Sequence, residues 1–456
     1  MNPANSTTFL RVSSACRPAA KLYSISSLRP IDKGGYSVAS MINNFGQVVG
    51  HASEQAKSVT RAFAWSSEHG LVPDLGSVYG QSSFATNIND KGVIVGYVAT
   101  PNNSLRAFLL GHGQMYDLGL LASIEEDEAF SVATDINESG RVVGYSHNAD
   151  NMVHGYVWNH ESGMTDIGAL GTGRSYAYAI NDSGVAVGWS QVDEPWGYRA
   201  FCWREDDGIT ELAGRETLPT VAYGINNSGT ICGAAAHGVL ANVLQCALWT
   251  PSGLVELGSL FGMSFSAGYA INDVGQVVGW AYPTPQCEMK LGRAMIWDQV
   301  RGMQDLNDLL PPDSRWILHK ATGINNDGDI VGCGTFDGRQ QAFMLTPEDY
   351  AREVTKSIEF TQLNLISNQK TGAIYRTIVV KNVSHKSIKG PLQMVFKGLA
   401  PGITIVGAAG EIDGNPIRTV KLDELGAGSQ LSTTVQFSNP QSRIINYDIE
   451  CYAGSF

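Results

Sequence analysis

The chain has 456 residues, too many for one ordinary hydrophobic core, so its length predicts two folding units. Its net charge is −12 and it has no basic run, which excludes a surface built to follow a phosphate backbone, so nucleic acid is not an expected partner. No apolar run reaches the roughly 18 residues of a membrane span, so membrane insertion is not expected either.

The first 20 residues are rich in Ser and Thr and contain neither an acidic residue nor a continuous apolar segment. This composition predicts a disordered or targeting tail over residues 1–20 and no ordinary secretory signal peptide. The seven cysteines follow no metal-ligand or disulfide spacing, and four of them lie in apolar runs, which is typical of buried free thiols. Neither a metal nor a cofactor is expected.

A motif of the form Ile-Asn-x-x-Gly recurs along residues 21–350. Its isoleucines follow one another at intervals of 44 to 53 residues, at Ile42, Ile88, Ile136, Ile180, Ile225, Ile271 and Ile324. Each interval contains four short apolar or β-branched runs bounded by turn residues, and each run is typical of a strand. Four strands in a period of roughly 40 to 50 residues predict an all-β fold, a seven-bladed β-propeller.

The Asn-x-x-Gly part of the motif lies between the first two strands of each repeat. It predicts a tight hairpin turn in which Gly takes a positive φ and Asn bonds the backbone of the turn. A second glycine ends the apolar run that follows, as in "VVG" at 48–50, and would let a neighbouring strand approach closely. The fourth-strand pattern is missing after the seventh motif but is present in "KLYSISSLRP" (21–30), so we expect an N-terminal strand to complete the last blade.

Three segments together carry a family resemblance: "AYAINDSGVAVG" (177–188), "AFAW" (62–65) and "GLVPDLG" (70–76). They resemble the bacterial HAF-type extracellular repeat family, and the resemblance covers residues 21 to about 348. It implies a surface or secreted location without a defined chemistry. The N-terminus departs from that family picture because it has no ordinary signal peptide, so a cytoplasmic location or effector-type export stays open.

The repeat stops near Tyr350, and residues 351–456 have a different pattern. Apolar runs at roughly ten-residue spacing, separated by Gly, Pro and Asn turns, predict an immunoglobulin-like or fibronectin-like β-sandwich. The expected strands lie at 375–384, 390–399, 403–412, 417–425, 429–440 and 444–452. Such modules usually act as spacers or adhesive units.

Ligands are expected over the loops that join the second and third strands, because these loops vary in length and content. The Asn-x-x-Gly turns would lie on the opposite face. Beside the variable loops stand two sets of candidate ligand-binding residues. An aromatic set follows the second glycine: His51, Tyr97, Tyr145, Trp189 and Trp280. It would either stack on sugar rings or a peptide, or pack between blades. A basic set precedes the third strands, Arg61, Arg106, Arg199 and Arg293, and would bind an acidic glycan or form salt bridges with nearby acids.

Catalytic motifs are missing: the sequence has no supported nucleophile elbow, zinc-protease motif or P-loop, so its catalytic residues are unknown. The acidic run Glu125–Glu128 is typical of a solvated patch, although paired carboxylates also cleave glycosides. We therefore expect a non-enzymatic binding scaffold for a protein partner or a glycan. The alternatives are a polysaccharide lyase or hydrolase with dispersed residues, and a secreted bacterial effector that acts on host partners.

Overall fold

The computed structural model describes residues 22–28, 35–53, 59–102, 104–121, 129–193, 197–214, 218–237, 243–284, 291–311, 313–348, 352–368, 373–412, 414–422 and 424–454. Its contacts divide the chain into two compact units, Met1–Thr346 and Pro347–Phe456. The predicted all-β class is confirmed. Among the described residues the helical segments are the short 3-10 helices η2 (Leu306–Leu309) and η3 (Thr355–Ser357), so none is long and apolar enough to cross a membrane.

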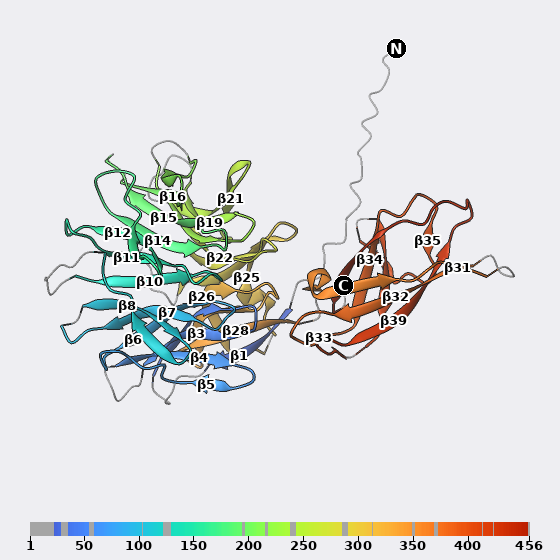
Figure 1. Cartoon of the computed structure of the whole chain (residues 1–456), viewed down its shortest axis with the longest axis horizontal. Coiled ribbons are helices and arrows are strands. Elements are labelled where there is room, and N and C mark those ends of the chain that lie inside the picture. Colours follow the sequence, from blue (N-terminus) through green and yellow to red (C-terminus); the bar gives the residue numbers. More distant parts are fainter. Residues whose placement is uncertain are drawn as a thin grey trace, which may run out of the picture. The chain divides into compact units, whose positions relative to one another are not determined.

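The first unit contains seven four-stranded sheets, which can be followed from blue to orange in Figure 1. In six of them the strands pair in chain order. These six are β2 (Ser37–Ile42), β3 (Val48–Ser53), β4 (Thr60–Ser66) and β5 (Gly70–Val72); β6 (Ser83–Ile88), β7 (Ile94–Ala99), β8 (Leu105–Gly111) and β9 (Gln114–Asp117); β10 (Ser131–Ile136), β11 (Val142–His147), β12 (Val153–Asn159) and β13 (Gly163–Asp166); β14 (Ser175–Ile180), β15 (Ala186–Gln191), β16 (Tyr198–Arg204) and β17 (Gly208–Glu211); β18 (Thr220–Ile225), β19 (Ile231–Ala236), β20 (Leu244–Thr250) and β21 (Gly253–Gly258); β22 (Phe265–Ile271), β23 (Val277–Tyr282), β24 (Arg293–Asp298) and β25 (Gly302–Asp305).

The seventh sheet joins the two ends of the first unit. Its strand order is β1 (Leu22–Leu28), β28 (Arg339–Glu348), β27 (Ile330–Phe336) and β26 (Trp316–Ile324), so the N-terminal strand lies beside a strand more than 300 residues later. Tyr23 and Leu28 of β1 are buried in this position. The last sheet is thus completed by the segment for which the sequence predicts this role.

Side-chain amides of the seven motif asparagines close a circle of hydrogen bonds. Each Nδ2 donates to the main-chain oxygen of the asparagine in the next sheet at 3.0–3.3 Å, in the order Asn43, Asn89, Asn137, Asn181, Asn226, Asn272, Asn325 and back to Asn43. The Oδ1 of the same side chain accepts the N–H four residues later in its own turn, at about 2.9 Å. One asparagine therefore stabilises its hairpin and ties it to the neighbouring sheet, which explains why the motif repeats.

A second circle runs through the residue after each asparagine. Its backbone N–H donates at 2.6–3.0 Å to the side-chain oxygen of the equivalent residue in the next sheet, through Asn44, Asp90, Glu138, Asp182, Asn227, Asp273, Asn326 and back to Asn44. Only Asn, Asp and Glu occupy this position, and each carries the oxygen that the bond requires. We call these two circles together the turn ring. It shows that the seven sheets follow one another around a closed path.

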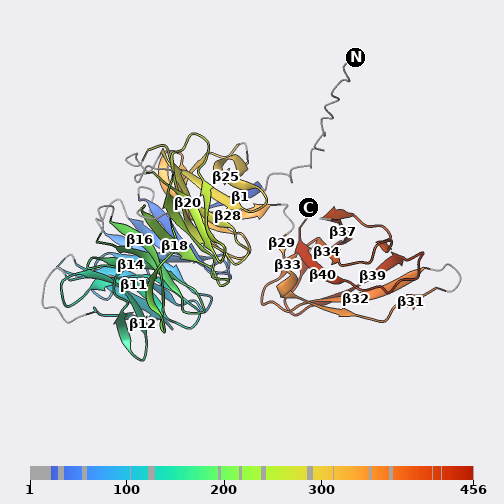
Figure 2. The same cartoon turned by 90° about the horizontal axis from the view of Figure 1, so that it is seen from above.

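The second unit has two larger sheets, drawn from orange to red in Figure 2. One has the order β29 (Arg352–Glu353), β40 (Asp448–Ala453), β34 (Leu392–Lys397), β37 (Asn415–Val420) and β36 (Gly410–Ile412). The other has the order β30 (Ile358–Gln362), β32 (Ile374–Asn382), β39 (Gln430–Ser438) and β35 (Thr404–Ile405), with β31 (Ile366–Ser367) paired to β32. A short pair is formed by β33 (Ile388–Lys389) and β38 (Glu424–Leu425).

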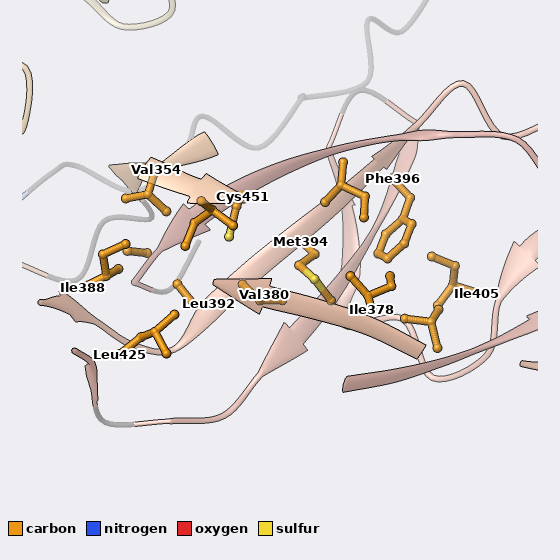
Figure 3. Close-up of a cluster of buried hydrophobic side chains, with 14 of the residues drawn as sticks. Val354, Ile378, Val380, Ile388, Leu392, Met394, Phe396, Ile405, Leu425 and Cys451 are labelled. Carbon is orange, nitrogen blue, oxygen red and sulfur yellow. The ribbon is translucent and has the colours of Figure 1, made fainter. Parts of the chain in front are cut away.

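Side chains from both of these sheets form one buried core, shown in Figure 3. Ile378 and Val380 of β32 pack there with Met394 and Phe396 of β34. Buried residues alternate along the second half of β32, at Ile378, Val380 and Asn382, as expected for a strand with one covered face. The expected single strand at 403–412 is wrong: its two ends belong to different sheets, and Gly407 between them has a φ of +70°.

Candidate functional site

A cavity of about 530 Å³ lies in the first unit, and it is lined by the strand of each sheet that precedes the Asn-x-x-Gly turn, which is β26 in the seventh sheet. Such a volume is within the range of about 300–1,000 Å³ that is usual for small-molecule sites. The turn ring borders the cavity, with Asn43, Asp90 and Glu138 among its lining residues. The turns, which the sequence analysis places away from a ligand, are therefore part of the wall of this cavity.

Each strand that precedes an Asn-x-x-Gly turn contains a β-bulge, and the bulge places one side chain in the cavity wall. In the first sheet Ala39 pairs with Gly50 and Met41 with Val49, so Ser40 is the extra residue. The equivalent residues, all in the lining, form what we call the bulge ring: Ser40, Thr86, Thr134, Tyr178, Tyr223, Tyr269 and Thr322.

The second glycine of each repeat is what permits the bulge. A Cβ at Gly50 would lie 2.1 Å from the main-chain oxygen of Val38, and the six equivalent glycines show the same approach at 1.9–2.0 Å. Real Cβ atoms do not come so close to a carbonyl, so any other residue here would push the bulged strand away. The predicted close approach at this glycine is confirmed, and its consequence is the orientation of the bulge ring.

Small hydroxyl residues occupy four positions of the bulge ring, and the three threonines among them bond the scaffold. The hydroxyls of Thr86, Thr134 and Thr322 donate to main-chain oxygens of the next sheet at 2.8–2.9 Å. Because these side chains are short, residues of the second strands also reach the cavity, and His51, Tyr97 and Tyr145 line it.

Three consecutive tyrosines occupy the other positions. Tyr178 and Tyr223 stack with ring centroids 5.5 Å apart, and Tyr223 and Tyr269 stack at 5.4 Å. Lys320 covers the end of this stack, with Nζ 3.8 Å from the ring centroid of Tyr269. The bulge ring is therefore asymmetric on a repeated scaffold, with bulky aromatic side chains along one arc and short ones along the rest.

The predicted aromatic set is divided by the structure. His51, Tyr97 and Tyr145 line the cavity, whereas Trp189 and Trp280 are outside its lining. Trp189 stacks on Tyr176 with centroids 4.6 Å apart, and its Nε1 donates to the hydroxyl of Tyr178 at 3.0 Å. Trp280 packs against Tyr282 at 4.8 Å. These contacts lie within the sheets of the two tryptophans and not between neighbouring sheets.

The predicted basic set does not reach the cavity. Nitrogens of Arg61, Arg199 and Arg293 lie 3.5–3.9 Å from carboxylate oxygens of Asp74, Glu211 and Asp305 respectively. Arg106 donates to the main-chain oxygen of Ala129 at 2.6 Å. The salt-bridge alternative thus fits three of the four, and the predicted run Glu125–Glu128 lies outside the described residues.

Burial shapes the protonation of the cavity wall. It raises the pKa of Tyr178 to about 12, and it raises the pKa values of Tyr97, Tyr145 and Tyr223 above the usual value, so these phenols keep their protons at neutral pH. Burial also lowers the pKa of His51 to about 4, which leaves this imidazole uncharged.

Asp135 is a carboxyl group whose protonation differs from the usual state. Burial raises its pKa to about 7, although three donors bond its oxygens: Asn87 Nδ2 at 2.6 Å, the N–H of Ile136 at 2.8 Å and the N–H of Ile180 at 2.7 Å. Both carboxyl oxygens are thereby engaged in holding three neighbouring sheets together.

Charges of both signs surround the cavity. Carboxylates of Asp90, Glu138, Asp182 and Asp273 lie in the turn ring, and among the described lining residues Lys320 supplies the cationic side chain. Within the described part of the chain no group of three or more His, Cys, Asp or Glu side chains is arranged to hold a metal ion.

A family described as a protein of unknown function (DUF3466) matches residues 118–381, which is more than half of the chain. The chain belongs to this family. No curated protein matches the sequence. The matched segment contains the bulge-ring residues Thr134, Tyr178, Tyr223, Tyr269 and Thr322.

Several solved structures are similar to parts of the chain at low identity. TolB of Acinetobacter baumannii is 13% identical, with 56% of this chain and 64% of that chain covered and a TM-score of 0.36. A puromycin-hydrolyzing peptidase of Mycobacterium tuberculosis is 12% identical, with 75% and 58% covered and a TM-score of 0.42. A lectin of Aleuria aurantia is 14% identical, with 59% and 94% covered and a TM-score of 0.34. Likeness at this level says nothing about ligand or activity.

Sequence reasoning missed the bulge ring, Lys320 and Asp135. The signal was present: the residue two positions before each motif isoleucine is Ser or Thr in four repeats and Tyr in three. Regular alternation along these strands hides the bulge, because a sequence pattern alone does not reveal one extra residue in a strand.

Proposed function

We propose that the first unit is a seven-bladed β-propeller that binds a small ligand in its axial cavity, and that the protein is a non-enzymatic binding scaffold. The seven four-stranded sheets and the closed turn ring support the propeller. The two sheets around one core support an immunoglobulin-like sandwich as the second unit. In this view the turn ring fixes the blades and the bulge ring provides the site.

One observation carries the proposed site: phenol hydroxyls without protein partners face the cavity. Those of Tyr97, Tyr145 and Tyr223 form no hydrogen bond with any described residue and are not among the buried side-chain atoms without partners. Tyr269 is 36% exposed. Packing alone would be served as well by phenylalanine at these positions, whereas a hydroxyl in a cavity wall can recognise a ligand.

Binding is favoured over hydrolysis by the state of Asp135. Its raised pKa would suit a general acid in the polysaccharide-processing alternative. However, both of its oxygens already accept hydrogen bonds, two of them from backbone N–H groups, so protonation of a leaving group would require these bonds to break. Asp135 therefore supports the wall and does not act as the acid.

The location of the protein rests on the sequence. The HAF-type resemblance supports a surface or secreted role, and export as an effector is the alternative. For either location, we propose the cavity as the site in place of the loop-rich face. Three of the nine predicted site residues line the cavity, and the four arginines among the nine bond other groups.

A thermal-shift screen of the full chain tests the proposal. The library contains neutral sugars, amino acids, organic acids and polyamines, and every hit is repeated with a Tyr145→Phe/Tyr223→Phe double variant. We expect at least one compound to raise the Tm of the wild type and to raise that of the double variant less. Hits that act equally on both proteins would place binding elsewhere, and a screen without hits would contradict a small-molecule site.

A further inference from the structure

We propose that the axial cavity binds a neutral polyhydroxylated ring compound, such as a monosaccharide or disaccharide. This inference rests on the proposed binding function and names the ligand class for the same site. Three features support the inference: the phenol groups of the cavity wall, the charged side chains around the cavity, and the contacts that the aromatic ring of Tyr269 already makes.

Tyrosines from five sheets line the cavity: Tyr97, Tyr145, Tyr178, Tyr223 and Tyr269. After burial, the neighbouring phenols of Tyr178, Tyr97 and Tyr269 raise the pKa of Tyr145 further, and these three residues belong to three other sheets. Protonated phenols both donate and accept hydrogen bonds, as sugar hydroxyls do. A ring of such groups is complementary to a ligand that carries several hydroxyls.

Charged ligands fit this wall poorly. Anions approaching from the turn ring meet the carboxylates of Asp90, Glu138 and Asp182, and Asp273 adds a fourth negative charge. Organic cations bind to open aromatic faces, but the ammonium group of Lys320 already lies 3.8 Å from the ring centroid of Tyr269, and Tyr223 stacks on the same ring at 5.4 Å. A neutral ligand avoids both the carboxylates and the ammonium group.

Apolar contact is available beside the hydroxyls. Val38 and Val132 line the cavity and pair in register with His51 and Tyr145, so they lie at the level of these side chains. A sugar ring has C–H groups that pack against such side chains while its hydroxyls bond the phenols. The cavity of about 530 Å³ has room for a small compound of this kind.

Calorimetric titration of the full chain tests the ligand class. The probes are glucose, galactose, mannose, fucose, N-acetylglucosamine, maltose, cellobiose and lactose, with glucuronate and spermidine as charged comparators. We expect at least one neutral sugar to bind, and glucose to bind better than its uronate. Tyr145→Phe and Tyr223→Phe should each weaken the binding about 2- to 12-fold, the usual effect of one lost neutral hydrogen bond.

Tyr116→Phe is the matched control, because Tyr116 is on β9, outside the cavity lining, and its hydroxyl donates to Gln114 at 2.6 Å. It should leave the affinity unchanged. If glucuronate or spermidine binds more tightly than every neutral sugar, the proposed ligand class is wrong. If Tyr145→Phe also weakens that binding, the cavity is still the site. No heat from any neutral probe would overturn the inference, while the wider screen would still judge the binding function. Equal affinities of the Tyr145→Phe and Tyr116→Phe variants would remove the cavity as the site.

Discussion

The bulge ring lies in seven strands, and the asparagines of the turn ring lie three residues later, in the turns that follow these strands. The two rings differ in how far the repeats agree. At the turn ring every repeat has an asparagine with the same two bonds, one within its hairpin and one to the next sheet. At the bulge ring the backbone is repeated but the side chains are not, since four are Ser or Thr and three are Tyr. The asparagines of the turn ring, which are the same in every repeat, therefore build the scaffold. The bulge-ring residues, which differ between repeats on the same backbone, form the proposed site.

Removal of the closing strand should have the largest effect on the scaffold. Deletion of residues 1–30 exposes the edge of β28 and removes the buried Tyr23 and Leu28. At about 1.5–3 kcal/mol for each buried large apolar side chain, we expect a loss of about 3–6 kcal/mol in the free energy of unfolding. Denaturant unfolding of the truncated chain measures it, and an unchanged midpoint would contradict the account of closure.

A break in the turn ring should have the next largest effect on the free energy of unfolding. Asn181→Ala leaves the N–H of Val185 and the main-chain oxygen of Asn226 without the bonds that they have at 3.0 and 3.2 Å. The N–H of Val185 is then unsatisfied, which costs about 1–3 kcal/mol, whereas the oxygen of Asn226 keeps the N–H of Gly229 at 3.0 Å and loses one bond of about 0.5–1.5 kcal/mol, so we expect a loss of about 1.5–4.5 kcal/mol. Denaturant unfolding of this variant is compared with that of Asn181→Asp, which keeps the acceptor oxygen and should lose less. Equal losses would show that the bond within the hairpin, from Val185 N–H to the Oδ1 of Asn181, contributes nothing.

Asp135 lies next to the bulge ring and should make stability depend on pH. Its folded-state pKa of about 7 lies above the ordinary 3.8, so the folded protein binds more protons than the unfolded chain between these values. The free energy of unfolding should therefore fall as pH rises through this window, by at most about 1.4 kcal/mol per pH unit. Denaturant unfolding at a series of pH values should show this fall in the wild type and a smaller one in Asp135→Asn; parallel curves would contradict the assignment.

Loss of one bulge-ring hydroxyl should have the smallest effect on stability. Tyr223→Phe keeps the stack between Tyr178 and Tyr269 and removes a hydroxyl without a described partner. We expect the free energy of unfolding to change by no more than about 0.5 kcal/mol. A loss as large as that of Asn181→Ala would mean that the bulge ring is scaffold too.

Much of the fold could be predicted from the sequence because it depends on local rules. Asn-x-x-Gly turns and alternating strands follow from short-range chemistry. The role of residues 21–30 as a closing strand could be predicted because the fourth-strand pattern is missing after the seventh motif and present there. The expected strand at 403–412 failed because Gly407 turns the chain between two sheets, which its apolar pattern does not reveal.

The site was harder to predict because it depends on contacts between sheets. Tyr178, Tyr223 and Tyr269 are 45 and 46 residues apart and meet only when three successive sheets pack together. Of the predicted aromatic set, the residues that line the cavity are those whose sheets carry Ser or Thr at the bulge, such as His51 beside Ser40. Where the bulge residue is Tyr178, it accepts a hydrogen bond from Trp189 of the second strand, which is outside the cavity lining.

The most direct test of the account is a calorimetric titration of the neutral sugars into the wild type and the Tyr145→Phe/Tyr223→Phe double variant. The account predicts binding to the wild type, an affinity that is weaker by about 4-fold or more in the double variant, and equal Tm values for the two proteins. Equal affinities, or no binding of any sugar to the wild type, would contradict the claim that the bulge ring recognises a neutral sugar.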